Sequence, residues 1–330
     1  MPTSQLFIWS ADREAFGLIK IYLLFSEVPL DFEALSTCVS SGPCVVTQIS
    51  TALIIGMLLF MVASGLSLIF GVLGVINFAH GAFYMAGAYF TFAIYQVTSS
   101  FLLAFLAGAV GVGIIGVIFE RFIMSRVYGK DVLMQLLVCY AVILIFDDLV
   151  KIFAGAEYKM MGMPETFALP PIEFAGGFIP PYYIFMVVVS LCIGGGMWFV
   201  IEKTRLGKIV RALAVNPQMV GALGINTVLL YSAVFGFGSI FAGVAGALAA
   251  PTRTLTPGMG LSVLIESFIV TVIGGMGSIP GALVAALLIG FTRAFGAIGF
   301  PLFVDGIMFG MMALVLILKP SGLLGRGAAR

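Results

Sequence analysis

The sequence predicts an all-α polytopic membrane protein, and three observations lead to that fold class. Hydrophobic residues make up 61% of the 330 residues and charged residues only 9%, whereas soluble domains carry about 25% charged residues. The apolar residues form long runs, and about 20 apolar residues in a helix cross the hydrocarbon core of a bilayer. The polar connections are too short to form a soluble domain. The formal net charge of +1 gives no indication of nucleic-acid binding.

Residues 1–47 are mixed in composition, and we expect an N-terminal extension that lies outside the membrane core. Residues 16–25 are apolar but interrupted by Lys20, which favours a helix on the membrane surface over a span. No small-residue cleavage site follows an apolar core, so a removable signal peptide is not expected.

About nine apolar runs follow and predict a transmembrane domain over residues 48–325, with a tail at 326–330. Five prolines and three glutamates interrupt the connection 154–181, which we therefore expect to be a loop outside the membrane. The other long connection is 202–225. The nine runs lie at 48–74, 77–97, 101–119, 132–153, 182–201, 226–250, 262–278, 281–299 and 302–318.

The positions of the charges predict the orientation. Residues 120–131, 202–225 and the C-terminus fall on one side, where they carry ten of the sixteen lysines and arginines but only three of the fifteen acids. Because positive loops stay in the cytoplasm, this side is expected to be cytoplasmic. An odd number of spans then places the N-terminus outside the cell.

The four cysteines do not have metal-ligand spacing, and His80 is the one histidine, so no metal site is expected. Cys139 and Cys192 sit in apolar runs and read as small core residues. Cys38 and Cys44 share a polar segment, where they can form a disulfide if that segment faces an oxidising compartment. Two free thiols are the alternative.

The stretch 202–225 is a basic interruption of the apolar chain, with Lys203, Arg205, Lys208 and Arg211 within nine residues. A short helix is expected after it, because Asn216 is a good N-cap, Pro217 suits a first turn and Gly224 suits a C-terminal stop. Its apolar side chains would form a binding surface for another protein outside the membrane. The alternative is a basic loop held by lipid head groups. The apolar residues of this expected binding surface are Met219, Val220 and Leu223.

Small residues predict tight helix packing at two places. In the run 226–250 they recur every fourth residue, on one helix face, and allow close approach of another backbone in lipid. The glycines and the proline of 274–281 predict a tight turn between two helices; a phosphate-binding loop is not expected, because the lysine of that motif is missing. The residues of the packing stripe are Gly238, Ala242, Gly246 and Ala250.

A polar and aromatic cluster between the first two runs predicts a helix break inside the bundle. It comprises Asn77, His80, Gly81 and Tyr84. Asn77 and His80 could hydrogen-bond a solute on a translocation path, or they could staple two helices together.

The positions of the ionisable residues favour a transporter that is driven by a partner protein over a secondary carrier. The ionisable residues within the apolar runs fall near the run ends that we place at the outer face of the membrane. There Asp147 can pair with Lys151, and Arg293 can pair with Glu266 or Asp305. Secondary transporters keep such groups near the bilayer midplane. Accumulating a solute a thousandfold costs roughly 4 kcal/mol, and this work would have to come from a partner. A stand-alone carrier or channel is the alternative, and an intramembrane enzyme is not expected.

Three stretches resemble the permease subunits of branched-chain amino-acid-type ABC importers. The first is Gly71–Gly81. The second runs from Arg205 to Asn226. The third is Val272–Ala282, followed by Lys319–Gly325. The resemblance covers roughly residues 45–326.

The resemblance implies a type II-like permease fold in a bacterial or archaeal cytoplasmic membrane, without a bound cofactor. It implies a second, homologous permease, two cytoplasmic ATPases that hydrolyse the ATP, and an extracytoplasmic solute-binding protein. The segment Arg211–Ile225 would be the coupling helix that docks into an ATPase cleft. Lys208 and Arg211 would face acidic or lipid neighbours. Met219, Val220, Ala222 and Leu223 would be its apolar contacts.

The solute that the resemblance implies is a small polar molecule, most simply a branched-chain or other neutral amino acid, with urea and short amides as alternatives. Two positions depart from the pattern. Ala82 stands where an acidic or polar residue is common, and Glu266-Ser267 stands where a Lys-Ala pair is common.

Overall fold

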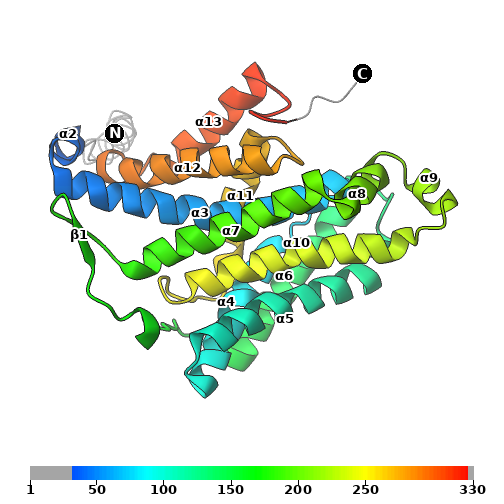
Figure 1. The fold of residues 1–330 in the computed structure, drawn as a ribbon, viewed down its shortest axis with the longest axis horizontal. Helices are drawn as coiled ribbons and strands as arrows, with labels where there is room; N and C mark the ends of the chain where they lie inside the picture. The colour runs from blue at the N-terminus through cyan, green and yellow to red at the C-terminus, as the bar shows by residue number, and fades with distance from the viewer. Residues whose placement is uncertain (1–31, 326–330) are drawn as a thin grey trace, which may run out of the picture.

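The computed structural model describes residues 32–325 of the chain (Figure 1). The surface helix expected at 16–25 and the tail 326–330 lie outside the described residues. The elements are α2 (Phe32–Ser40), α3 (Gly42–Leu73), α4 (His80–Thr98), α5 (Phe101–Phe122), η1 (Met124–Arg126), α6 (Val132–Ala154), η2 (Glu165–Phe167), β1 (Ile172–Phe174), β2 (Gly177–Ile179), α7 (Pro181–Lys203), α8 (Arg205–Val215), α9 (Pro217–Ala222), α10 (Thr227–Ala249), α11 (Met259–Gly274), α12 (Ile279–Gly299) and α13 (Val304–Leu318).

Each of the nine apolar runs contains a helix, but not all of these helices qualify as spans. Among the described helices, α3, α5, α7, α10 and α12 are long and apolar enough to cross a membrane, and α11 and α13 are shorter apolar helices. The number of nine crossings therefore stays a prediction. The first span starts before the expected residue 48, because Pro43 occupies the first turn of α3 and is tolerated there.

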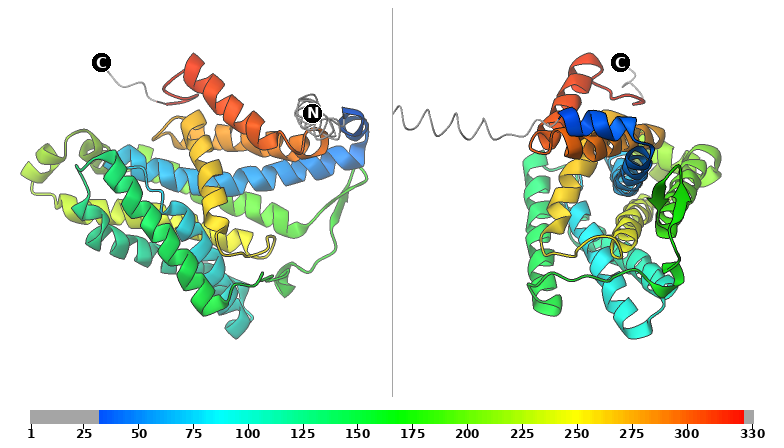
Figure 2. Two further views of the ribbon diagram at one scale, coloured as in Figure 1. Left: turned by 180° about the vertical axis from the view of Figure 1, so that it is seen from behind. Right: turned by 90° about the vertical axis from the view of Figure 1, so that its left-hand side faces the viewer.

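The bundle is built from two three-helix units, α3–α4–α5 and α10–α11–α12, and the first and third helices of each unit pack mainly on helices of the other unit. The most extensive helix contacts join α12 to α3 and α5 to α10, so the third helix of each unit packs on the first helix of the other (Figure 1). Small residues permit these contacts: Gly56 lies against Ala286, and Gly243 lies against Gly108 and Ala109. α7 and α10 cover one face of the bundle, and α6 crosses the opposite face (Figure 2).

The middle helix of each unit begins inside the bundle, after a non-helical segment. Gly74 ends α3 with φ +68°, residues 74–79 lead back into the bundle, and α4 starts at His80. Residues 250–258 precede α11 in the same way. The two starts meet, because Gly81 and Gly260 are in backbone contact and a side chain at either position would collide with the other chain segment.

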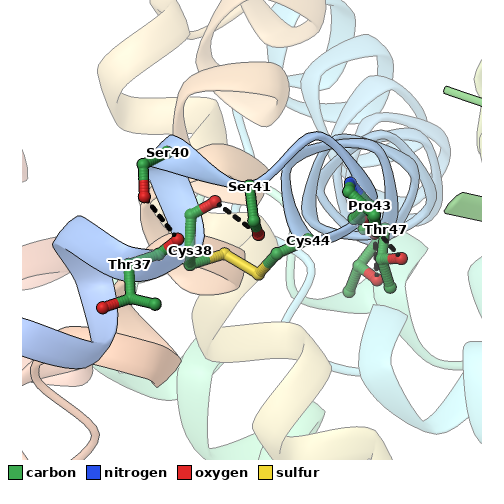
Figure 3. Close-up of a disulfide and its surroundings, with 8 residues drawn as sticks. Thr37, Cys38, Ser40, Ser41, Pro43, Cys44 and Thr47 are labelled. Atoms are coloured by element: carbon green, nitrogen blue, oxygen red, sulfur yellow. Dashed lines mark hydrogen bonds between the residues drawn. A yellow bond between two sulfur atoms is a disulfide. The ribbon is translucent and has the colours of Figure 1, made fainter. Parts of the chain in front are cut away.

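The two ends of the bundle carry different structures. At one end, the disulfide end, Cys38 and Cys44 are bonded (Figure 3), which decides between the two states that the sequence left open. The hairpin β1–β2 sits beside it, where Gly176 and Gly177 lie against the first turns of α3. At the other end lie α8 and α9 (Figure 1), and we call it the α9 end.

Candidate functional site

The basic stretch folds into two short helices whose ends are fixed by local hydrogen bonds. Asn216 caps α9 by accepting from the backbone N–H of Met219 over 3.0 Å, and Pro217 follows in the first turn. Gly224, with φ +80°, ends the helix, and the N–H groups of Gly224 and Ile225 donate to the carbonyls of Gly221 and Val220 at 3.0 and 3.4 Å. The sequence signals for this helix therefore correspond to its geometry.

The apolar residues of α9 divide between the protein and its surroundings. Met219 and Leu223 are 62% and 72% exposed, and Ala222 is exposed as well, whereas Val220 is only 3% exposed. The expectation that Val220 faces a partner is corrected, because this side chain is buried within its own chain. Val215, 87% exposed just before the cap, extends the outward apolar surface and was missed by sequence reasoning.

The basic side chains divide in the same way. Arg211 donates to the Ile201 carbonyl and pairs with Glu202 at 3.4 Å, so it ties α8 to the end of α7. Arg211 thus has an acidic neighbour, as expected, but this neighbour belongs to its own chain. The ammonium of Lys203 lies 5.9 Å from the centroid of the Trp198 ring, while Lys208 is exposed.

A cleft of about 750 Å³ opens between α8 and the turn that joins α11 to α12. The three stretches that carry the family resemblance meet here. Ser67 accepts a hydrogen bond from the N–H of Gly277 at 3.0 Å, and the N–H groups of Leu323 and Leu324 donate to the last carbonyls of α11. The cleft is lined among others by Gly71, Arg211, Val215, Gly277, Pro280 and Leu324.

The helix break before α4 contains buried polar groups that are only partly bonded. Asn77 and His80 are fully buried, and Tyr84 is 1% exposed. His80 Nε2 lies 3.1 Å from the carbonyl of Val62, and the thiol of Cys139 lies 3.9 Å from Asn77 Oδ1. The other polar atoms, Asn77 Nδ2 and His80 Nδ1, have no partner among the described residues. Helix-to-helix contacts therefore involve only one of the two polar side-chain atoms of each residue.

The small-residue stripe of α10 lies where this helix meets the first unit. Gly238 is beside the Gly65 carbonyl of α3, and Gly246 is beside the backbone of Ala88 on α4. Ala242 and Ala250 are fully buried. Within residues 32–325, no group of His, Cys, Asp and Glu side chains could hold a metal ion.

Of the ion pairs expected within the runs, the one of Arg293 with Glu266 forms and the one of Lys151 with Asp147 does not. Lys151 pairs with Asp148 at 3.0 Å rather than with Asp147, whose carboxylate accepts from the N–H of Gly258 at 3.2 Å. Arg293 pairs with Glu266, one of its two expected partners. Glu266 lies mid-way along α11 and is 8% exposed, not near a helix end as the run 262–278 had indicated.

Comparison with known proteins supports the family resemblance over most of the chain. Residues 48–317 match the family described as "Branched-chain amino acid transport system / permease component". The chain is 31% identical to the high-affinity branched-chain amino acid transport system permease protein BraD of Pseudomonas aeruginosa, over 84% of this chain and 95% of BraD. It is 28% identical to LivH of Escherichia coli (84% and 95%) and 26% identical to a probable LivH of Methanocaldococcus jannaschii (83% and 90%). No solved structure matches.

Proposed function

The chain belongs to the family of branched-chain amino acid transport permease components, and from that premise we propose that it is the transmembrane permease subunit of an ATP-driven importer. The solute is a small neutral amino acid, most simply a branched-chain one. The observation that carries the proposal is α9, a capped helix that presents Met219 and Leu223 outward while Val220 is buried. Such a helix suits docking into the groove of a partner.

The proposed partners follow from the free energy that accumulation of a solute requires. A thousandfold accumulation costs roughly 4 kcal/mol, so two ATPase subunits at the α9 end supply it, and this chain does not hydrolyse ATP itself. A homologous second permease completes the path, and a solute-binding protein delivers the solute at the opposite end. ATP-driven closure of the ATPases would move α8 and α9 and rock the bundle between two openings.

The orientation proposed for this assembly places the α9 end in the cytoplasm and the disulfide end outside. The positive charges of 202–225 support the first placement. The Cys38–Cys44 disulfide supports the second, since disulfides persist in oxidising compartments. The membrane is the cytoplasmic membrane of a bacterium or archaeon.

Reconstitution tests the proposal. Proteoliposomes that hold this chain with its permease, ATPase and binding-protein partners should take up labelled leucine when ATP is inside, and an inactive ATPase should abolish uptake. Uptake by this chain alone, driven by an ion gradient, would instead identify a stand-alone carrier. Competition by unlabelled valine, but not by urea or acetamide, should identify the solute class.

A substitution in α9 tests the docking role. Leu223→Asp puts a charge on an exposed apolar contact, and loss of a central interface residue costs about 2 kcal/mol, or roughly 30-fold in affinity. We expect co-purification of the ATPase and uptake to fall by this factor while membrane insertion is unchanged. Ile172→Asp, which changes an apolar residue that is 49% exposed on β1 at the other end, is the control. Equal uptake by both variants would count against docking at α9.

A further inference from the structure

Glu120 is a buried carboxylate at the end of α5, and both of its oxygens are bonded to hydroxyl groups. Its exposure is 1%. Tyr128, in the linker between α5 and α6, donates to Oε1 over 3.0 Å, and Ser232 of α10 donates to Oε2. None of the ion pairs among residues 32–325 includes Glu120. Glutamate side chains are almost never fully buried without an ion-pair partner, so this arrangement requires an explanation.

Packing alone does not supply that explanation, because the rest of the α5–α10 contact is made without charge. Gly116 lies against Ser239, whose hydroxyl is bonded within its own helix to the carbonyl of Phe235. Small residues of this kind suffice for close helix approach. The Glu120–Ser232 bond adds a directional contact at the end of the seam that lies nearest to α9.

The contacts continue from Glu120 to the helix break before α4. The Tyr128 N–H donates to the carbonyl of Met124 at 3.2 Å. The Met124 sulfur lies 3.9 Å from the sulfur of Cys139 on α6, and the same Cys139 sulfur lies 3.9 Å from Asn77 Oδ1. A continuous series of contacts therefore joins the start of α10 to Asn77.

We propose that Glu120 is a positioning residue that transmits movement of α9 to the break at 74–79. α9 leads through residues 223–226 directly into α10, so a shift of α9 moves Ser232. Glu120 passes this shift to the α5–α6 linker, and α6 passes it to Asn77. This inference rests on the proposed function, since an ATPase would impose the movement. Mutations along such networks change coupling by factors of roughly 2 to 30.

The test measures coupling rather than activity. In the reconstituted complex, Glu120→Ala should lower the leucine taken up per ATP hydrolysed by roughly 2- to 30-fold. Glu120→Gln, which can still bond both hydroxyls, should restore most of the ratio. Ser232→Ala and Tyr128→Phe should each lower the ratio, and adding either to Glu120→Ala should have little further effect. Ser239→Ala removes an equally buried hydroxyl from the same seam and is the matched control.

The outcomes separate this inference from the proposed function. If the wild-type complex shows no ATP-driven uptake, the proposed function fails. If the wild type transports but the Glu120→Ala ratio is normal, or falls no more than that of Ser239→Ala, the relay is wrong and Glu120 is structural only. Should Glu120→Ala not assemble, the ratios of Ser232→Ala and Tyr128→Phe decide: normal ratios in both overturn the proposal.

Discussion

The two helix breaks have the same place in their units but are held differently. The break 250–258 is tied down from outside: Leu255 exchanges two backbone hydrogen bonds with Lys159 at 2.8 and 3.0 Å, and Asp147 holds the N–H of Gly258. The break 74–79 contains Asn77 and the adjacent His80, each with a buried nitrogen that lacks a partner among the described residues. The two breaks thus differ in whether their buried polar atoms are hydrogen-bonded. The break 74–79, where polar atoms lack a partner, is the one that a small change in free energy could rearrange.

The largest expected effect comes from the contact that both breaks share. Gly81→Val would push a side chain into the Gly260 backbone, and overpacking of this kind costs about 1–3 kcal/mol or more. We expect a lower melting temperature in detergent and loss of uptake. Gly195→Val on α7, where nothing lies within 4 Å, is the matched control. Normal uptake with Gly81→Val would show that the two starts do not need to touch.

A smaller effect is expected at the break that is tied down. Asp147→Ala removes a charge-assisted hydrogen bond to Gly258; because Asp147 is partly exposed, we expect a loss of about 1 kcal/mol. Thermal unfolding of the purified protein measures it, with Asp148→Ala as the control, because this variant loses a charge and an exposed ion pair with Lys151 that contributes little to stability. If the two variants are equally stable, the 250–258 break is no better anchored than its counterpart.

The smallest effect on stability is expected at the other break. Asn77→Leu replaces a partly bonded amide by an apolar side chain of similar size, and the one partner that it leaves is the Cys139 thiol, a weak donor, so we expect a change within about 0.5 kcal/mol. Uptake should nevertheless fall, if this amide takes part in rearrangement or solute contact. Stability and uptake that fall together would instead identify Asn77 as a simple staple between helices.

Local signals were sufficient for features that depend on neighbouring residues in the chain. The caps of α9 at Asn216 and Gly224 require only the residues next to them. The run lengths likewise located a helix in each apolar segment. The family could be recognised from three stretches of sequence, and the structure shows that residues of all three line one cleft.

Features that depend on distant residues could not be predicted in this way. Val220 is apolar like Met219, and only the fold decides which of them faces the core. The start of α11 follows Gly258, whose N–H is held by Asp147 on another helix. Glu120 was counted only as a charge at the end of a run; its spacing of four from Gly116, itself in a small-residue seam, was the available signal.

The packing of the two three-helix units on each other has a consequence for biosynthesis. When the ribosome has delivered α3, α4 and α5 to the membrane, the helices on which α3 and α5 pack most extensively have not yet been made. Insertion must therefore precede tertiary assembly, and the glycine-lined faces of the early helices remain in contact with lipid until α10 and α12 arrive. A chain cut in the connection 155–180 should yield two fragments that are unstable alone and assemble when co-expressed.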